Sequence, residues 1–137
     1  MIVVDTSALM AVLKTETAAA ECNDILSDGS QRLLISAATV TEAYIVASRN
    51  QRLVEMKMLI AASEAEIIPL TSTRAERAAI AYQRFGKGFH SAALNFGDCF
   101  SYATAEEFGC PLLYVGDDFA RTDIRSALTT TSPNESL

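Results

Sequence analysis

Short, densely apolar runs alternate along the chain with longer segments whose apolar positions recur at helical spacing. The runs do not alternate with polar residues, which is typical of strands buried on both faces of a sheet. The predicted strands are residues 2–4, 33–36, 67–70 and 111–115. The predicted helices cover residues 8–13, 17–26, 39–48, 53–63, 72–85 and 98–108. This order predicts a single α/β domain over residues 1–128, a short parallel sheet flanked by helices on both faces.

The last residues, 129–137, are rich in Thr and Ser and contain a Pro, so we expect a disordered tail. No apolar run approaches the roughly 20 residues that span a bilayer. The first residues lack the basic region and cleavage site of a signal peptide. The sequence therefore predicts a cytoplasmic protein that is not held in a membrane.

Acidic residues stand where the predicted strands end or where the adjoining helices begin. Asp5 directly follows the first strand, and the pair Asp117 and Asp118 follows the last strand after one glycine. Glu42 lies one to two turns into the helix after the second strand, and Asp98 begins the helix that leads into the last strand. Because ligands of open parallel sheets bind beyond the carboxyl ends of the strands, we expect these side chains to converge on one cleft.

Carboxylates gathered in one cleft repel one another unless a cation neutralises them. No Lys or Arg is interleaved with these positions near the strand ends, and an all-oxygen ligand set suits Mg²⁺, with Mn²⁺ as the alternative. Such an ion activates water and neutralises the leaving oxygen when a phosphodiester is hydrolysed. We expect Thr6 or Ser7 to orient the water or a carboxylate from behind the metal ligands.

Each of these carboxylates also has an ordinary structural role open to it. Asp5 and Asp98 stand where Asp commonly caps a helix. Glu42 follows Thr39 at the spacing of a capping box, and the two aspartates after Gly116 suit a turn. Only the common edge of the sheet favours one shared site over separate structural roles.

Charge and composition say less about the binding partners of this chain than the acidic residues do. The net charge of −6 argues against binding nucleic acid through the overall field. The basic helix over 74–87 is interpreted first as a solvated face and second as a track for backbone phosphates. Three cysteines without a C-x-x-C spacing predict neither disulfides nor a zinc site. His90, the only histidine, is expected in a loop or packing role.

Three stretches of the chain resemble PIN-domain ribonucleases and, more narrowly, the VapC toxins of VapBC toxin–antitoxin modules. They are D-T-S-A at 5–8, L-N-F-G-D-C-F-S-Y-A at 94–103 and G-D-D-F-x-x-T-D-I at 116–124, joined by Glu42. The resemblance extends from residue 2 to about residue 127. It implies a metal-dependent endoribonuclease that forms a homodimer, cleaves RNA such as tRNA or rRNA, and is silenced by a VapB-like antitoxin blocking its cleft.

Residue by residue, the resemblance places Asp5 and Asp98 as the principal metal ligands and Glu42 at the third acidic position. The fourth position falls on Asp117 or Asp118, and Asp118 is slightly favoured because it directly precedes the Phe of the motif. The early helices are the expected partner surface.

Two other hypotheses remain open at this stage. A PIN nuclease that processes RNA without being a toxin would carry the same residues. A non-catalytic metal- or phosphate-binding α/β module is the hypothesis from another class. A phosphate-accepting receiver is disfavoured because Asp98 begins a helix and no Lys follows the last strand.

Overall fold

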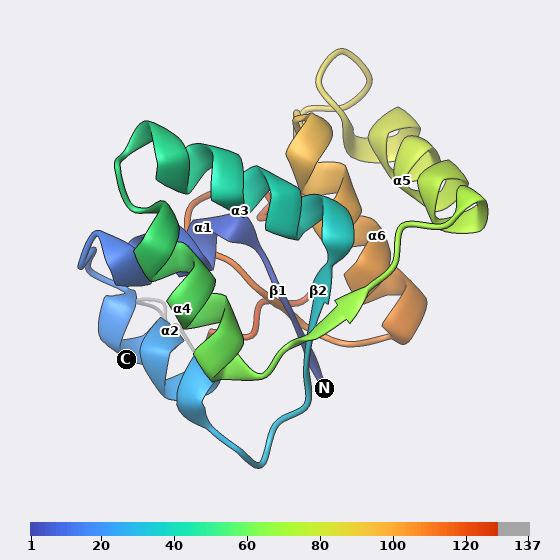
Figure 1. Ribbon diagram of the computed structural model, residues 1–137. Coiled ribbons are helices and arrows are strands. Elements are labelled where there is room, and N and C mark those ends of the chain that lie inside the picture. Colours follow the sequence, from blue (N-terminus) through green and yellow to red (C-terminus); the bar gives the residue numbers. More distant parts are fainter. Residues whose placement is uncertain (129–137) are drawn as a thin grey trace, which may run out of the picture.

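The computed structural model describes residues 1–128, so the expected disorder of 129–137 lies outside the described residues. Four parallel strands form one sheet in the order β3-β2-β1-β4 (Figure 1). The strands are β1 (Ile2–Val4), β2 (Leu33–Ser36), β3 (Glu66–Ile68) and β4 (Leu112–Leu113). The helices are α1 (Thr6–Leu13), α2 (Ala19–Ser27), α3 (Ala37–Arg49), α4 (Leu53–Ser63), α5 (Ser72–Phe85) and α6 (Phe96–Phe108). The predicted fold class is confirmed.

The unalternating pattern of the strands follows from burial on both faces of the sheet. Val3 and Val4 are neighbours in β1 and both are buried, yet they belong to different core clusters. Val4 packs in a core built with α1 to α4, whereas Val3 packs in a core built with α5 and α6. All four strands are parallel, so their carboxyl ends meet at one edge of the sheet.

Helix α6 begins earlier than the sequence predicted. Phe96 and Gly97, expected in an irregular segment, form its first turn, and Asn95 is its N-cap. The prediction that Asp98 caps this helix is wrong, because Asn95 occupies the cap and Asp98 stands three residues later. The two side chains form a reciprocal capping box, in which each accepts the other's backbone N–H.

Helix α3 also begins earlier, at Ala37, because Ser36 both ends β2 and caps the helix through its side chain. Thr39 therefore lies inside the helix, and its predicted capping-box spacing with Glu42 is not used. Strand β3 stops at Ile68, directly before Pro69, rather than continuing to residue 70. Among residues 1–128, the helices are all too short or too polar to cross a membrane.

Candidate active site

Asp5 lies directly beyond β1, where it is held by three hydrogen bonds. Its Oδ2 accepts the backbone N–H and the hydroxyl of Ser7, at 3.0 and 2.7 Å. Its Oδ1 accepts the hydroxyl of Ser101 on α6, at 2.5 Å. Asp5 is thus the N-cap of α1, as its structural alternative predicted, and its buried carboxylate is also oriented toward α6. The two roles coexist.

Thr6 and Ser7 connect the acidic residues to the ends of two neighbouring strands. The Thr6 hydroxyl donates to Glu42 Oε1 at 2.6 Å, so the first residue of α1 fixes a side chain of α3. Ser7 Oγ accepts the backbone N–H of Val115, just beyond β4, at 3.0 Å. Burial raises the pKa of Glu42 and the charge of Asp5 adds to the shift, although the Thr6 hydrogen bond opposes it.

Asp98 is the most strongly perturbed of these carboxylates. It is buried, and burial raises its pKa from 3.8 to about 7, although the hydrogen bond from the Asn95 N–H opposes the shift. The charges of Asp5, Asp118 and Glu42 raise it further. The structure thus brings together four of the five predicted acidic side chains.

The fourth carboxylate comes from the exposed turn that follows β4. Both members of the pair, Asp117 and Asp118, are exposed there, after Gly116 has turned the chain at a φ of +100°. The charge of Asp118 raises the pKa of Asp98, whereas Asp117 is not among the causes of that shift. Of the two, Asp118 is therefore the one coupled electrostatically to Asp98.

The oxygen-only composition of this cluster fits a hard divalent cation. Across residues 1–128, no three Asp, Glu, His or Cys side chains are already spaced to hold a metal ion. Burial is the main cause of the raised pKa values of Asp98 and Glu42, and the charges of neighbouring carboxylates add to it, a repulsion that such a cation would relieve.

Two hydroxyl groups behind Asp5 were not predicted from the sequence. Ser101 is completely buried, and its Oγ lies 3.2 Å from that of Thr39 on α3. Because Ser101 donates its proton to Asp5, Thr39 donates to Ser101. Ser101 stands three residues after Asp98 and so shares a face of α6 with it, a spacing that could have marked it as part of the site.

Gly97 also supports the site and was not predicted to do so. Because it has no side chain, it leaves room for Glu42. A Cβ at this position would collide with Glu42 Oε2 and lie 2.5 Å from Glu42 Cδ. Glu42 can approach the first turn of α6 only because residue 97 is a glycine. The L-N-F-G-D stretch therefore contributes the Asp98 carboxylate and also the space for Glu42.

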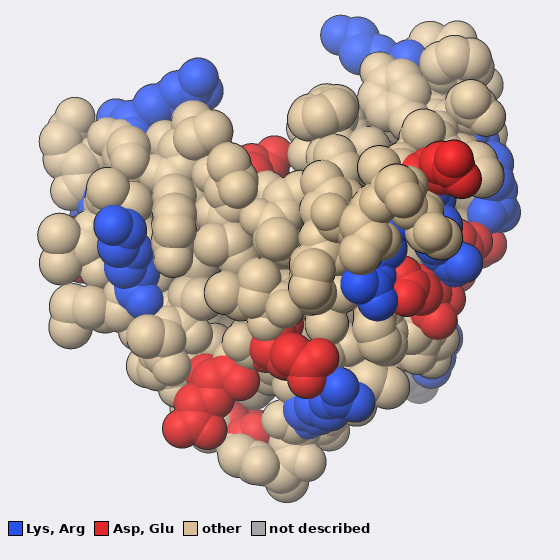
Figure 2. Space-filling model, turned by 45° about the vertical axis from the view of Figure 1, so that its right-hand side comes forward, with Lys and Arg blue, Asp and Glu red and all other residues tan. Residues whose placement is uncertain are grey.

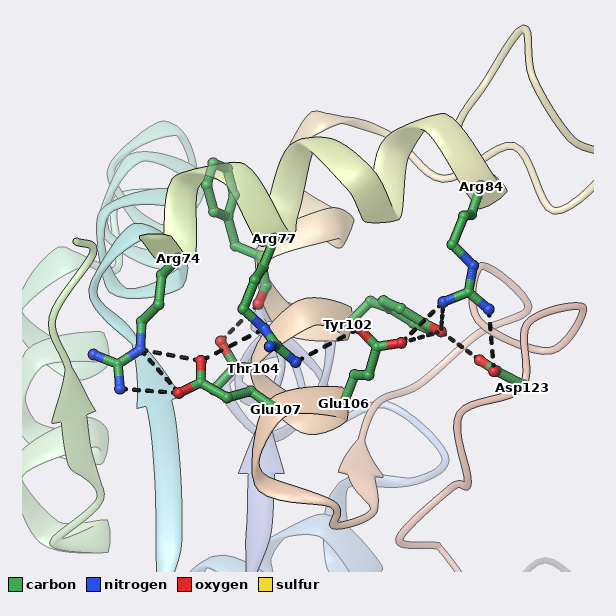
Figure 3. A network of polar contacts seen from close by, with 9 residues as sticks. Arg74, Arg77, Arg84, Tyr102, Thr104, Glu106, Glu107 and Asp123 are labelled. Atoms are coloured by element: carbon green, nitrogen blue, oxygen red, sulfur yellow. Dashed lines mark hydrogen bonds and ion pairs between the residues drawn. The ribbon is translucent and has the colours of Figure 1, made fainter. Parts of the chain in front are cut away.

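The other residues with candidate chemistry lie outside this cluster. His90 accepts the N–H of Ala92 through Nδ1 and packs edge-on against Phe85, which agrees with the predicted loop or packing role. The basic side of α5 is not simply solvated, because its arginines face acidic residues of α6 (Figure 3). The ion pairs include Arg74–Glu107 at 3.1 Å and Arg84–Glu106 at 2.9 Å.

Comparison with known proteins identifies the family. The PIN domain model matches residues 2–125. Ribonuclease VapC of Mycolicibacterium smegmatis is 36% identical over 126 residues, which cover 89% of this chain and 96% of that protein. Ribonuclease VapC28 of Mycobacterium tuberculosis is 38% identical over 129 residues, covering 92% and 97%.

Solved structures show the same fold. The crystal structure of Mycobacterium tuberculosis VapC20, described as a toxin that cleaves the sarcin-ricin loop, matches with a TM-score of 0.71. The match covers 90% of this chain and 96% of that one, at 16% identity. A toxin–antitoxin complex from Klebsiella pneumoniae matches with a TM-score of 0.66 at 22% identity, covering 90% and 93%. The chain belongs to the PIN-domain family and, within it, to the VapC ribonucleases, the endoribonuclease toxins of VapBC modules.

Proposed function

We propose that this ribonuclease hydrolyses RNA with Mg²⁺ or Mn²⁺ held by Asp5 and Asp98, and that Glu42 and Asp118 complete the acidic site. The observation that carries the proposal is the clustering of these carboxylates beyond the strand ends, where Ser7 and Ser101 hold Asp5, Thr6 holds Glu42, and the charges of the other three act on the buried Asp98. When bound, the metal would polarise the phosphodiester and lower the pKa of the attacking water.

The chain's own residues would hold the reacting groups and move one proton. Ser7 and Ser101 fix both oxygens of Asp5, so this carboxylate presents a constant geometry. Thr6 occupies Glu42 Oε1, which leaves Oε2 beside Gly97 to accept the proton of the attacking water. The raised pKa of Glu42 suits a general base better than an ordinary carboxylate would. No covalent nucleophile is needed.

RNA cleavage by the purified chain at subsaturating Mg²⁺ tests this assignment through its pH dependence. A proton on Asp98 competes with the metal below pH 7, so the rate should rise about tenfold per pH unit up to about 7 and then level off. EDTA should abolish cleavage at every pH. Cleavage that persists in EDTA, or a rate independent of pH between 5 and 8, would contradict the proposal.

The raised pKa of Asp98 also makes the stability of the metal-free protein depend on pH. The folded-state pKa of Asp98 lies above its unfolded value of 3.8, so folding favours the protonated carboxyl. The stability that Asp98 contributes is therefore present below pH 4 and is lost as pH rises toward 7. Metal binding would restore it at high pH.

The partners of this ribonuclease follow from its family and its charge. We propose a VapB-like antitoxin as the inhibitory partner, which makes the chain a toxin rather than a processing nuclease. An antitoxin segment carrying Lys or Arg would suit the acidic edge of the sheet. A cationic side chain there would stabilise the ionised Asp98 and Glu42, whose pKa values are raised, as a metal ion would.

A broad uncharged face over α3, α5 and α6 is the proposed homodimer interface (Figure 2). Phe96, 75% exposed, projects from α6 and packs edge-on against Phe100. A groove lies on either side of this pair. One, of about 480 Å³, is largely apolar and lined by Ile45, with Glu42 and Arg49 also in its wall; the other, of about 640 Å³, is lined by Phe89. A projecting ring between two grooves suits a two-fold interface in which each copy fills the other.

The early helices, the surface expected from the sequence, are less suited to this contact. Leu9 and Met10 of α1 and Leu26 of α2 are buried in the core. In the described part of the chain, no exposed large apolar side chain lies on α1 or α2. We therefore propose the face over α3, α5 and α6 in their place.

Replacing Ile45 by Glu should shift the chain from dimer to monomer. In a two-fold contact the two introduced charges lie near each other in an apolar setting, and we expect dimer dissociation to become at least about 100-fold easier. Light scattering after size-exclusion chromatography measures the mass. Val54→Glu, on the outer side of α4, is the control that should remain dimeric. A monomeric wild type, or a dimeric Ile45→Glu, would refute the interface.

A further inference from the structure

A buried tyrosine of α6 is bonded to the segment that follows β4. The ring of Tyr102 is completely buried, and its hydroxyl donates to Asp123 Oδ1 (Figure 3). Arg84 on α5 closes the group, donating to Glu106 Oε2 at 2.9 Å and lying 3.5 Å from Asp123 Oδ2. Three separate parts of the chain, α5, α6 and the segment after β4, therefore meet at the Asp123 carboxylate.

The bond lies one helical turn away from the acidic site. Tyr102 follows Asp98 by four residues on α6, and Asp123 follows Asp118 by five residues in the segment after β4. The segment thus meets α6 twice: the charge of Asp118 acts on Asp98, and Asp123 accepts the Tyr102 hydroxyl. The second contact fixes how the segment is placed along α6, and so where Asp118 stands.

The segment between these two points is internally braced. Ala120 N–H donates to the carbonyl of Asp117, and Thr122 N–H donates to the carbonyl of Phe119, both at 3.1 Å. Phe119 itself is buried in the core beside α6. Phe119 and Asp123 are thus two anchors of this segment, and we expect the release of Asp123 to loosen the two turns that lie between it and Asp118.

We propose that Tyr102 and Asp123 are positioning residues that hold the segment 117–123 where Asp118 can reach the metal bound by Asp5 and Asp98. This rests on the proposed function. The other three carboxylates have their own restraints, from Ser7 and Ser101, from Thr6 and from the Asn95 capping box. Loss of the Tyr102–Asp123 bond should therefore act on the site through Asp118 alone.

The chemistry of the pair suits a permanent restraint. Burial raises the pKa of Tyr102, so its hydroxyl keeps the proton that it donates. The Asp123 carboxylate that accepts this proton also pairs with the Arg84 guanidinium at 3.5 Å. The Asp123 side chain is 61% exposed, so its replacement leaves no cavity in the core.

The test uses the full chain with Tyr102→Phe, Asp123→Ala and the conservative Asp123→Asn. Two quantities are measured: the Mn²⁺ dissociation constant, from electron paramagnetic resonance of free Mn²⁺, and amide hydrogen exchange without metal. Tyr102→Phe and Asp123→Ala should weaken Mn²⁺ binding about 10- to 100-fold and speed exchange at Ala120 and Thr122. Asp123→Asn keeps an acceptor oxygen for the tyrosine and should recover most of the affinity.

Glu107→Gln is the matched control. It breaks the Arg74–Glu107 ion pair, which joins the same two helices but does not touch the segment 117–123. It should leave both measurements at the wild-type value. An equal loss in Glu107→Gln would assign the effect to general packing of α5 on α6 and overturn the positioning role.

Wild-type Mn²⁺ affinity together with wild-type amide hydrogen exchange in Tyr102→Phe and Asp123→Ala would also overturn the positioning role. Should Tyr102→Phe fail to fold, Asp123→Ala and Arg84→Gln decide the outcome, because both replace exposed side chains and should weaken Mn²⁺ binding while the fold is kept. A wild type that binds Mn²⁺ but does not cleave RNA, with the variants still weakened, would refute the proposed function and leave the positioning role standing.

Discussion

Replacing Asp98 by Asn should lower metal-dependent RNA cleavage by about 10³-fold while the fold survives. Metal ions stabilise a transition state of phosphodiester hydrolysis by several kcal/mol, and about 4 kcal/mol corresponds to this loss of rate. Asn has nearly the same shape as Asp and can still accept the Asn95 N–H, so the capping box of α6 remains. Single-turnover cleavage of RNA in Mg²⁺ measures the effect.

The control for this variant is the wild type in EDTA, which should fall to the same residual rate. Circular dichroism should show unchanged helix content. At pH 8 without metal the variant should melt no lower than the wild type, because Asn removes a buried charge whose pKa is raised to about 7. An Asp98→Asn chain that keeps more than a tenth of the wild-type rate would refute the assigned metal ligand.

The second large effect is expected from Gly97→Ala, a change of one methyl group outside the acidic set. The added Cβ would overlap the Glu42 carboxylate, so Glu42 must swing away from α6 and give up its bond from Thr6. A displacement of about 1 Å in a reacting group can cost about 100-fold in rate, and we expect a loss of this size. Steady-state cleavage should show it mainly in kcat.

Gly29→Ala is the matched control, because no atom lies within 4 Å of the Cβ that it would add. That variant should cleave RNA at the wild-type rate. Both substitutions should leave the thermal midpoint within a few degrees, since Ala is at least as favourable as Gly in the first turn of α6 and the turn at Gly29 has room for a Cβ. Full activity in Gly97→Ala would show that Glu42 does not act from its observed position.

The fold could be predicted because its physical cause is local. Runs such as Ile2–Val4 and Leu33–Ser36 are apolar at every position, and only strands covered on both faces need that pattern. The helix boundaries were less predictable. Asn95 and Asp98 are equally good caps by residue type, and Ser36 and Thr39 are both acceptable, so the choice within each pair depends on where the preceding strand or loop ends.

The clustering of acidic residues at one edge of the sheet, with Thr6 and Ser7 beside them, could be predicted from the strand ends, whereas the contacts of Ser101 and Gly97 could not. Ser101 and Asp5 are 96 residues apart, and Gly97 meets Glu42 across two helices. A single sequence carries no signal for such pairs. The α5 arginines show the same limit: helical spacing revealed a common face, but only the packing showed that acids on α6 lie opposite them.

The most direct test of the metal site is Mn²⁺ binding at pH 8, measured by electron paramagnetic resonance on the wild type, Asp5→Asn and Asp98→Asn. The four-carboxylate site predicts that the wild type binds Mn²⁺ and that each variant loses at least about tenfold in affinity, in parallel with its loss of RNA cleavage. Equal Mn²⁺ affinity in all three proteins would contradict it.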